Sequence, residues 1–249
     1  MTLTIITACY NASSTIADTL KSIASQSYPH IEHIIIDGAS VDDTMSIVQQ
    51  FPHVSTCISE KDGGIYDAMN KGIEFCNGDI VGILNADDVY ANNDIISKVA
   101  ALFEDELVEA VYGDLVFVDQ LQPKKIKRTW IAGTYHYSQF YNGWMPPHPT
   151  FFVRKSLYEK FGNFNTMLTS AADYELMLRF LLKHKIKLAY LPEIMVRMRQ
   201  GGKSTASIKN RLIANKEDHL AWKINGLKPR PFTLILKPLR KIKQFITYG

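Results

Sequence analysis

The chain has 249 residues, of which 46% are hydrophobic and 21% charged. This composition suits one large globular domain and excludes a disordered or low-complexity protein. The apolar runs are too short to cross a bilayer. The three cysteines form no CxxC pair, which argues against a disulfide framework or a cysteine zinc site. The chain begins without a basic segment ahead of an apolar one, so we expect no secretory signal and a cytoplasmic protein.

Charge is distributed unevenly along the chain. Residues 1–100 contain four Lys, no Arg and thirteen Asp or Glu, whereas residues 219–249 contain seven Lys or Arg and no acid. The acidic part suits cations, and the basic end suits phosphates or an anionic membrane surface. Nucleic acid is a poor candidate partner, because residues 1–218 carry a net charge of −4 and no basic stripe.

The first hundred residues alternate between strand and helix patterns. We expect strands at 3–8, 31–37, 54–59 and 79–85, and helices at 13–26, 45–51, 65–76 and 92–103. This alternation predicts an α/β fold with a parallel, doubly wound sheet. Such a sheet binds ligands at the carboxyl ends of its strands.

The pattern is less regular after residue 110. We expect strands at 110–119 and 127–131, forming a hairpin, and at 186–191, with helices at 156–161, 171–184 and 204–224. Residues 134–150 are rich in aromatic residues and proline and have no clear period, so we expect a long loop over a site.

The last 24 residues, 226–249, form a basic tail. Its apolar residues fall on one face of an amphipathic helix, namely Phe232, Ile235, Leu239, Ile242 and Ile246. Pro238 is expected to bend this helix or to limit it to its last turns. A solvated helix, a contact with a lipid diphosphate and a contact with an anionic membrane surface are three alternatives, of which we favour the membrane.

Acidic residues follow three of the expected parallel strands. Asp37 closes the second strand, Asp62 follows the third, and Asp87 and Asp88 follow the fourth. Crowded carboxylates repel one another unless a cation lies between them, and Mg²⁺ or Mn²⁺ prefers such oxygen ligands. The glycine-rich loops GxGxxG and GxxxxGK[ST] are absent, so a bound diphosphate would have its charge neutralised by the metal.

Several motifs in order resemble those of one known family. TACYNASSTIADTLKSIASQSY, IIIDGASVDDT, SEKDGGIYDAMNKGI and GDIVGILNADD are followed by MPPHPTFFVRKSLYEKFGNFN, SAADYELMLRFL and MRQGGKS. Together they resemble the inverting glycosyltransferases of family 2, with the GT-A fold, across residues 1–205. The resemblance is strongest to bacterial enzymes that build exopolysaccharide, O-antigen or colanic acid.

The resemblance implies a fold and a division of the chain. A mostly parallel, Rossmann-like central sheet flanked by helices is expected, with a C-terminal helical extension. Residues 1–225 would form the glycosyltransferase domain, with residues 1–105 as its nucleotide-sugar half and 106–225 as its acceptor half. The partners implied are a nucleoside-diphosphate-sugar donor and a saccharide or lipid-linked saccharide acceptor, at most peripherally on the inner face of the cell membrane.

Site residues are carried over from the family motifs. Donor binding is assigned to Thr7, Tyr10, Asn11, Asp37, Asp62, Asn85, Asp88 and Lys203. Asn85-Ala86-Asp87 stands at the DxD position with Asn in place of the first acid, which leaves Asp87 as the expected ligand of Mg²⁺ or Mn²⁺. His148 is a second candidate ligand. Asp173 matches the catalytic base, although Ala172 replaces the Glu that often precedes it.

Each assignment has a structural alternative. Asp37 and Asp62 stand where turns form, Asp87 and Asp88 could cap a helix, and Asp173 could be a first-turn helix acid. His148 could be a packed loop residue and Lys203 a solvated lysine or a lid, and Arg179 is expected to pair with Glu175. Two other function classes remain open, which are a metal-dependent nucleotidyl- or phosphotransferase and a non-catalytic nucleotide-sugar binder.

Overall fold

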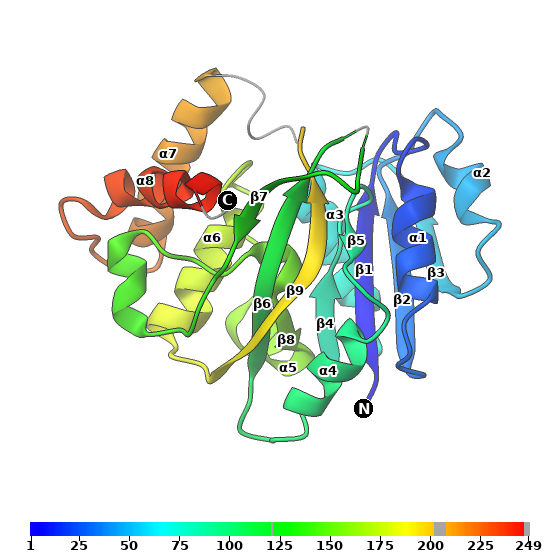
Figure 1. Cartoon of the computed structure of the whole chain (residues 1–249), viewed down its shortest axis with the longest axis horizontal. Helices are drawn as coiled ribbons and strands as arrows, with labels where there is room; N and C mark the ends of the chain where they lie inside the picture. Colours follow the sequence, from blue (N-terminus) through cyan, green and yellow to red (C-terminus); the bar gives the residue numbers. More distant parts are fainter. Residues whose placement is uncertain (121, 202–207, 247–249) are drawn as a thin grey trace.

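The structure is a computed structural model that describes residues 1–120, 122–201 and 208–246, with side chains described for 213–240 in the last range. The predictions for Lys203 and the other residues in 202–207 lie outside the described residues. Helices pack on both faces of a central sheet (Figure 1).

The described strands form one nine-stranded sheet in the order β3-β2-β1-β4-β8-β6-β9-β5, with β7 paired to β6. Their bounds are β1 Leu3–Cys9, β2 Ile31–Asp37, β3 Val54–Ser59, β4 Ile80–Ile83, β5 Val89–Tyr90, β6 Ala110–Val118, β7 Ile126–Trp130, β8 Phe152–Arg154 and β9 Leu188–Arg199. Strands β5, β7 and β8 run against the other six. The predicted mostly parallel α/β sheet is therefore confirmed.

Alternating side chains of the central strand serve two different cores. Leu3 and Ile5 of β1 pack with α1 (Ile16–Ala24) and α4 (Ile95–Leu102). Ile6 and Ala8 pack on the opposite face with α3 (Ile65–Phe75), α5 (Lys155–Phe161) and α6 (Ala172–Met177). Burial on both faces explains why this strand is mostly apolar in sequence, with Thr4 and Thr7 as its polar residues. The short helix α2 (Thr44–Val48) packs beside α1.

The second half differs from the prediction in several places. The expected loop at 134–150 contains two 3₁₀ helices, η1 (Tyr137–Asn142) and η2 (His148–Thr150). The expected helix at 171–184 is α6 followed by a π-helix, η3 (Leu178–Lys183). Strands β5 and β8 were not predicted, because they are two and three residues long. Strand β9 extends well beyond 186–191, along the whole length of β6.

Two helices close the described chain, α7 (Ile208–Ile224) and α8 (Thr233–Ile246), and both lie beside α6 (Figure 1). Pro238 was expected to bend the tail helix or to limit it to its last turns, and the second alternative is excluded because α8 begins five residues before this proline and continues past it. In the part of the chain that is described, no helix combines the length and the apolar character needed to cross a membrane.

The tail helix packs on the body of the protein through specific contacts. The hydroxyl of Thr233 donates to the carbonyl of Tyr141 at 2.6 Å, and Lys237 forms an ion pair with Asp218. Gly143 ends η1 with φ 75°, and a Cβ there would collide with the backbone of Lys237. Glycine is therefore required at this position both for its left-handed backbone and for the close approach of α8.

Candidate active site

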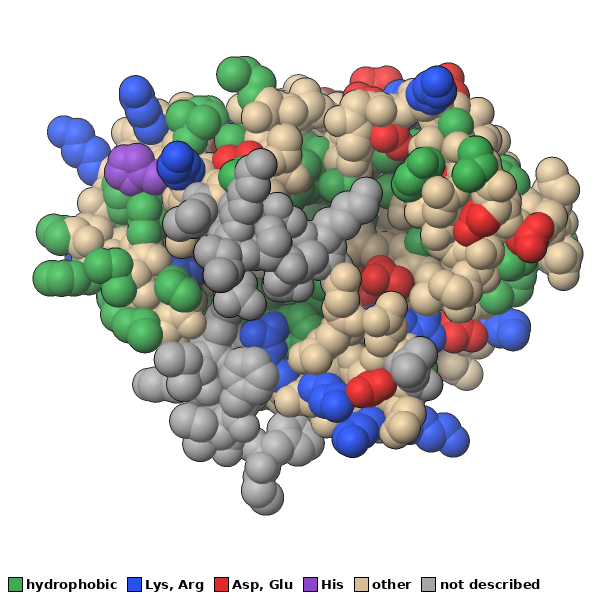
Figure 2. Space-filling model, turned by 90° about the horizontal axis from the view of Figure 1, so that it is seen from above, with side chains coloured by type: hydrophobic (Ala, Val, Ile, Leu, Met, Phe, Trp, Pro, Cys, Tyr) green, Lys and Arg blue, Asp and Glu red, His purple; other side chains and the backbone are tan. Residues whose placement is uncertain are grey.

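The carboxyl ends of the parallel strands bring most of the predicted site residues to one edge of the sheet. Cys9 and Asp37 are register partners at the ends of β1 and β2, and Asn85 follows the end of the adjacent strand β4. Figure 2 looks down on this edge, where acidic side chains lie in and around a hollow near the centre of the view. The parallel topology thus produces the convergence that the sequence predicted.

Asp37 organises the loop that follows β2. Its carboxylate is fully buried and accepts hydrogen bonds from the Ser40 amide at 2.9 Å, the Ser59 hydroxyl at 2.6 Å and the Ser40 hydroxyl. The Ser40 hydroxyl accepts from the Asn11 amide at 2.7 Å, and the Asn11 side chain accepts from the Val41 amide. The predicted turn role of Asp37 is therefore present, and its oxygens are engaged inside the protein.

Tyr10, Gly38 and Asp62 meet beside this loop. A Cβ on Gly38 would lie 2.7 Å from Oδ2 of Asp62 and 3.4 Å from the Tyr10 ring. A larger residue at position 38 would displace the Asp62 carboxylate from its present place beside Tyr10. Asp62 also accepts from the Gly64 amide at 2.9 Å, which confirms its turn role. Tyr10 is 55% exposed and is therefore accessible to a ligand.

Thr7 does not reach this edge. Its side chain is fully buried in β1, and its hydroxyl pairs with Nε2 of His33 at 3.1 Å. His33 in turn contacts Nε2 of His53 at 3.2 Å through Nδ1. Burial lowers the pKa of His33 to about 3, so this ring is neutral in the folded protein. Donor binding by Thr7 was an inference from the motif, and the structure places this residue in the interior.

Asp87 and Asp88 have different environments although they are adjacent. Asp88 is fully buried and accepts from the Arg199 amide at 3.3 Å and the Asn85 side chain at 3.2 Å. Burial and the charge of Asp87 raise the pKa of Asp88 well above its ordinary value. Asp88 therefore ties β9 to the β4 loop, and of the two carboxylates only Asp87 is partly exposed.

Asp87 is coupled to groups from the second half of the chain. Burial raises its pKa, while the charges of Arg199 and His148 favour the ionised form. Arg199 also donates to the backbone carbonyl of Asp87 at 3.4 Å and pairs with Asp18. Arg199, at the carboxyl end of β9, was not singled out from the sequence. It holds the loop that carries Asp87.

The oxygen ligands at this position fit a hard divalent cation. Oδ1 of Asn85 is buried and has no hydrogen-bond donor among the described residues, and Asp87 follows two residues later. No group of three or more His, Cys, Asp or Glu side chains within the described ranges could form a complete protein cage. Mg²⁺ is commonly held by one or two carboxylates together with substrate phosphates, so a complete cage is not required.

Asp173 faces the same region from α6. All of the other residues from 171 to 178 are buried, whereas the Asp173 side chain is 19% exposed. Its Oδ1 accepts from the Tyr66 hydroxyl at 3.2 Å, and its Oδ2 lies 3.6 Å from Nδ1 of His148. Burial lowers the pKa of His148, while the charges of Asp173 and Asp87 act in the opposite direction. His148 thus lies within electrostatic reach of both carboxylates.

Glu217 of α7 supports the start of α6. Its carboxylate accepts hydrogen bonds from the Thr169 amide and hydroxyl, from the Ser170 amide at 2.7 Å and from the Ala171 amide at 3.1 Å. These contacts fix the segment that leads into Asp173. Sequence reasoning missed Glu217 because it is 44 residues away in a polar helix. Tyr66, in contrast, stood within a motif and could have been selected.

The predicted pair of Arg179 with Glu175 is confirmed. Nε and Nη2 of Arg179 donate to the buried Glu175 carboxylate, at 3.2 and 2.9 Å. Nη1 donates to the carbonyls of Phe161 and Gly162, and Nη2 also donates to the carbonyl of Asn163. Arg179 therefore joins α6 to the segment after α5 and has no donor left for a diphosphate.

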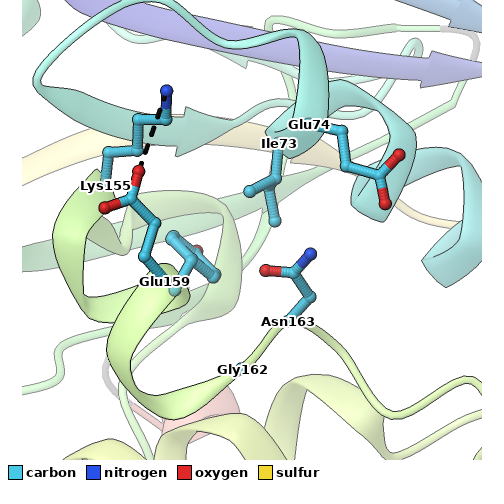
Figure 3. A pocket seen from close by; sticks show the side chains of 7 residues that line it. Ile73, Glu74, Lys155, Glu159, Gly162 and Asn163 are labelled. Carbon is cyan, nitrogen blue, oxygen red and sulfur yellow. Dashed lines mark ion pairs between the residues drawn. The ribbon is translucent and has the colours of Figure 1, made fainter.

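A separate surface hollow of about 370 Å³ lies between the end of α3 and α5 (Figure 3). Ile73, Glu74 and Asn163 line it, with Lys155 and Glu159 forming an ion pair at 3.9 Å. Ile73 is seven residues from Tyr66 on α3, which is about 10 Å along a helix axis. None of the predicted site residues lines this hollow, so it is distinct from the strand-end site.

Comparison with known proteins identifies the family. Residues 4–165 match the family model described as glycosyl transferase family 2. The chain belongs to this family. An uncharacterized glycosyltransferase of Mycobacterium tuberculosis is 32% identical over 188 residues, which cover 72% of this chain and 68% of that protein. This glycosyltransferase assignment confirms the resemblance found in the sequence motifs.

Two further relatives have names that refer to a pathway. A PGL/p-HBAD biosynthesis glycosyltransferase of Mycobacterium bovis is 28% identical over 70% of this chain and 68% of its own length. A putative teichuronic acid biosynthesis glycosyltransferase of Bacillus subtilis, TuaG, is 34% identical over 41% of this chain and 42% of its own length.

Solved structures show the same fold. Residues 1–349 of S. aureus TarS, in complex with UDP-GlcNAc, match all of this chain and 74% of that chain with a TM-score of 0.70 and 15% identity. This chain spans 44% of the longer TarS structure. The mannosyltransferase PcManGT from Pyrobaculum calidifontis, in complex with GDP-Man and Mn²⁺, has a TM-score of 0.67 and 21% identity, with 94% of this chain and 67% of that chain covered. The predicted GT-A fold is thereby confirmed.

Proposed function

We propose that this glycosyltransferase moves a sugar from a nucleoside-diphosphate donor to a hydroxyl of a saccharide acceptor, with inversion and with Asp173 as the base. The observation that carries the proposal is the position of His148 at the carboxyl edge of the sheet, 3.6 Å from the Asp173 carboxylate and within electrostatic reach of Asp87. Asp87 comes from the first half of the chain and Asp173 from the second. A donor held by the first half would therefore meet an acceptor activated by the second.

Asp173 has the environment that a general base needs. One of its oxygens receives a hydrogen bond from Tyr66, and partial exposure leaves the carboxylate accessible to an acceptor hydroxyl. As the acceptor oxygen forms its bond to the anomeric carbon, its proton passes to Asp173 and the bond to the diphosphate breaks. The electron pair of the broken bond leaves with the nucleoside diphosphate. Attack from the face opposite the leaving group inverts the configuration.

The donor is proposed to lie along the first half of the strand-end edge. Tyr10 and the Asp62 turn would contact the nucleoside, since they are the accessible groups beside the loop that Asp37 fixes. Asp87 and the unsatisfied oxygen of Asn85 would hold Mg²⁺ or Mn²⁺, with the diphosphate completing the coordination. The bound ion supplies stabilisation of the negative charge that develops on the leaving diphosphate. The Mn²⁺ in the PcManGT complex supports this assignment.

The acceptor is proposed to be a growing bacterial surface saccharide, carried on a polyprenyl lipid. The relatives named for biosynthesis of teichuronic acid and of PGL/p-HBAD support an acceptor of the cell envelope. A lipid-linked acceptor would place the reaction on the inner face of the cell membrane, with the enzyme bound peripherally.

A donor panel tests the proposed reaction. UDP-, GDP- and dTDP-sugars are incubated with the chain and a lipid-linked or soluble saccharide, and nucleoside diphosphate release is measured with Mn²⁺, with Mg²⁺ and with a chelator. We expect release that depends on acceptor and on metal and is lost in Asp173→Asn. Stabilisation by a nucleoside diphosphate in a thermal-shift assay identifies the donor base. Full turnover in Asp173→Asn, or turnover unaffected by chelation, would contradict the proposed mechanism.

A further inference from the structure

The tail helix α8 packs on the protein with the side opposite its row of large apolar residues. Thr233 is fully buried, Leu234 packs against the main core, and Lys237 pairs with Asp218 while its Nζ lies 3.5 Å from the centre of the Tyr174 ring. These residues lie on one side of the helix at 100° per residue. The side that faces the body therefore combines a hydroxyl, a leucine and a paired lysine.

The opposite side of α8 is apolar and faces outward. Phe232, Ile235 and Leu239 are 67%, 58% and 50% exposed. Their spacing of three and four residues places them in one row, roughly opposite the side formed by Thr233 and Lys237. In Figure 2, hydrophobic side chains gather at the left end of the molecule, where α7 and α8 lie in Figure 1. Such a row of large apolar side chains normally marks an interaction surface.

The positive charge of the C-terminal part of the chain indicates which kind of partner the apolar row of Phe232, Ile235 and Leu239 binds. Residues 219–249 carry seven Lys or Arg and no acid. Lys223, at the end of α7, and Lys228, in the segment between α7 and α8, are exposed, whereas Lys237 is already paired with Asp218. A second copy of this chain would bring the same positive surface against itself in a symmetric dimer, which is unfavourable. An apolar row with cations beside it is the pattern of a helix that lies in the interface of an anionic bilayer.

We propose that the outer face of α8, formed by Ile235 and Leu239 together with Phe232 directly before the helix, docks on an anionic lipid surface. The apolar side chains enter the boundary between headgroups and acyl chains, and the lysines contact anionic headgroups. Binding in this mode requires no membrane-spanning segment, and the part of the chain seen in the structure contains none.

This docking also orients the proposed active site. Lys237 joins α8 to Tyr174, the residue next to Asp173, and Asp218, which pairs with Lys237, is the residue next to Glu217. Helix α8 thus lies between the docked surface and the elements that hold the proposed base. This part of the inference rests on the proposed function, whereas lipid binding itself does not.

Vesicle flotation of the full chain tests the docking surface without an activity assay. We expect binding to phosphatidylcholine vesicles that contain phosphatidylglycerol, weaker binding at high salt, and little binding to phosphatidylcholine alone. The double variant Phe232→Ser/Leu239→Ser should bind at least about tenfold more weakly, because two large side chains no longer leave water. Lys223→Gln/Lys228→Gln should lose about fivefold per lysine, and the loss should shrink at high salt.

A matched control is Phe75→Ser/Leu107→Ser, which removes the same two residue types from exposed positions outside the tail. This control should bind vesicles like the unmodified chain. The proposal is overturned if the Phe232→Ser/Leu239→Ser variant binds anionic vesicles as strongly as the unmodified chain does. It is also overturned if the unmodified chain binds neutral and anionic vesicles equally. A third contrary result is a chain that binds no vesicles but forms a dimer that this variant does not form, because the face would then bind a second copy of the chain. Sugar transfer to a soluble acceptor that persists in a variant unable to bind vesicles separates failure of docking from failure of the proposed reaction.

Discussion

Two aspartates at the same edge of the sheet have opposite relations to their surroundings. Asp37 is fully buried and receives hydrogen bonds from the Ser40 amide and from two serine hydroxyls. Asp173 is partly exposed and, among the described residues, receives a side-chain hydrogen bond from the Tyr66 hydroxyl. The first carboxylate builds a loop, and the second is available for chemistry. A family motif alone does not separate these roles, since both residues stand in equally distinctive sequences.

The largest effect is expected for Asp173→Asn. An amide cannot accept the acceptor proton, so kcat should fall by about 10²–10⁴ while the melting temperature stays near that of the unmodified chain. Asp43→Asn, at the start of α2, is a matched control that should keep activity within about twofold. A fall in kcat of less than about tenfold for Asp173→Asn would mean that another group takes the proton.

The next largest effect is expected for Asp87→Asn, which should lower kcat by about 10–10³ and raise the concentration of Mn²⁺ needed for half activity. The same change should raise the melting temperature near neutral pH. Burial raises the pKa of Asp87, so its stabilising contribution is greatest below the ordinary Asp pKa and is lost as pH rises through the raised value. Calorimetry across pH measures this. A lower melting temperature, or an unchanged need for Mn²⁺, would contradict the assignment.

Asp37→Asn tests whether Asp37 has a structural role, in contrast to Asp173. The change replaces a carboxylate that several protein groups contact, and it should cost about 1.5–3 kcal/mol of unfolding free energy. Donor binding should weaken only slightly, because the change affects the donor indirectly, through a less ordered loop at 38–41. Denaturant unfolding, with calorimetric titration of the nucleoside diphosphate, measures the two effects separately. Unchanged stability together with a large loss of donor affinity would support the direct donor contact that the family motif assigned to Asp37.

A smaller effect is expected for Glu217→Ala, which removes the acceptor for the Thr169, Ser170 and Ala171 amides. Asp173 should then be positioned less well, so kcat should fall about tenfold while the KM for the donor stays unchanged. Glu217→Gln, which keeps one acceptor oxygen, should recover part of the activity. A donor KM that rises as much as kcat falls would indicate a general loss of structure instead.

The first half of the fold was largely predictable because its pattern is local. Strands β2 and β3 have the predicted bounds, Ile31–Asp37 and Val54–Ser59. The buried strand β2 contains an apolar run, whereas the edge strand β3 alternates between partly buried and exposed residues, and both patterns are local. The second half depends on contacts between distant residues. Strand β8 is three residues long and is held by β4 and β6, which no local pattern reveals.

The candidate site divides in the same way. The acids at the strand ends followed from the topology, and Asp173 followed from a motif. The supporting residues Glu217 and Arg199 could not be selected, because each acts on a loop far away in sequence and neither has a distinctive pattern. Asp87 and Asp88 differ in environment because the Arg199 amide donates a hydrogen bond to Asp88, and this contact cannot be read from the sequence.

One glycine has a consequence for how this enzyme can be varied. Gly143 lets the backbone of α8 press against the 3₁₀ turn that precedes the His148 segment. A single added methyl group would force the two apart, so the tail cannot be exchanged between relatives as an independent module. Chimaeras should retain activity only when a transplanted tail brings with it the donor sequence's own residues 137–143.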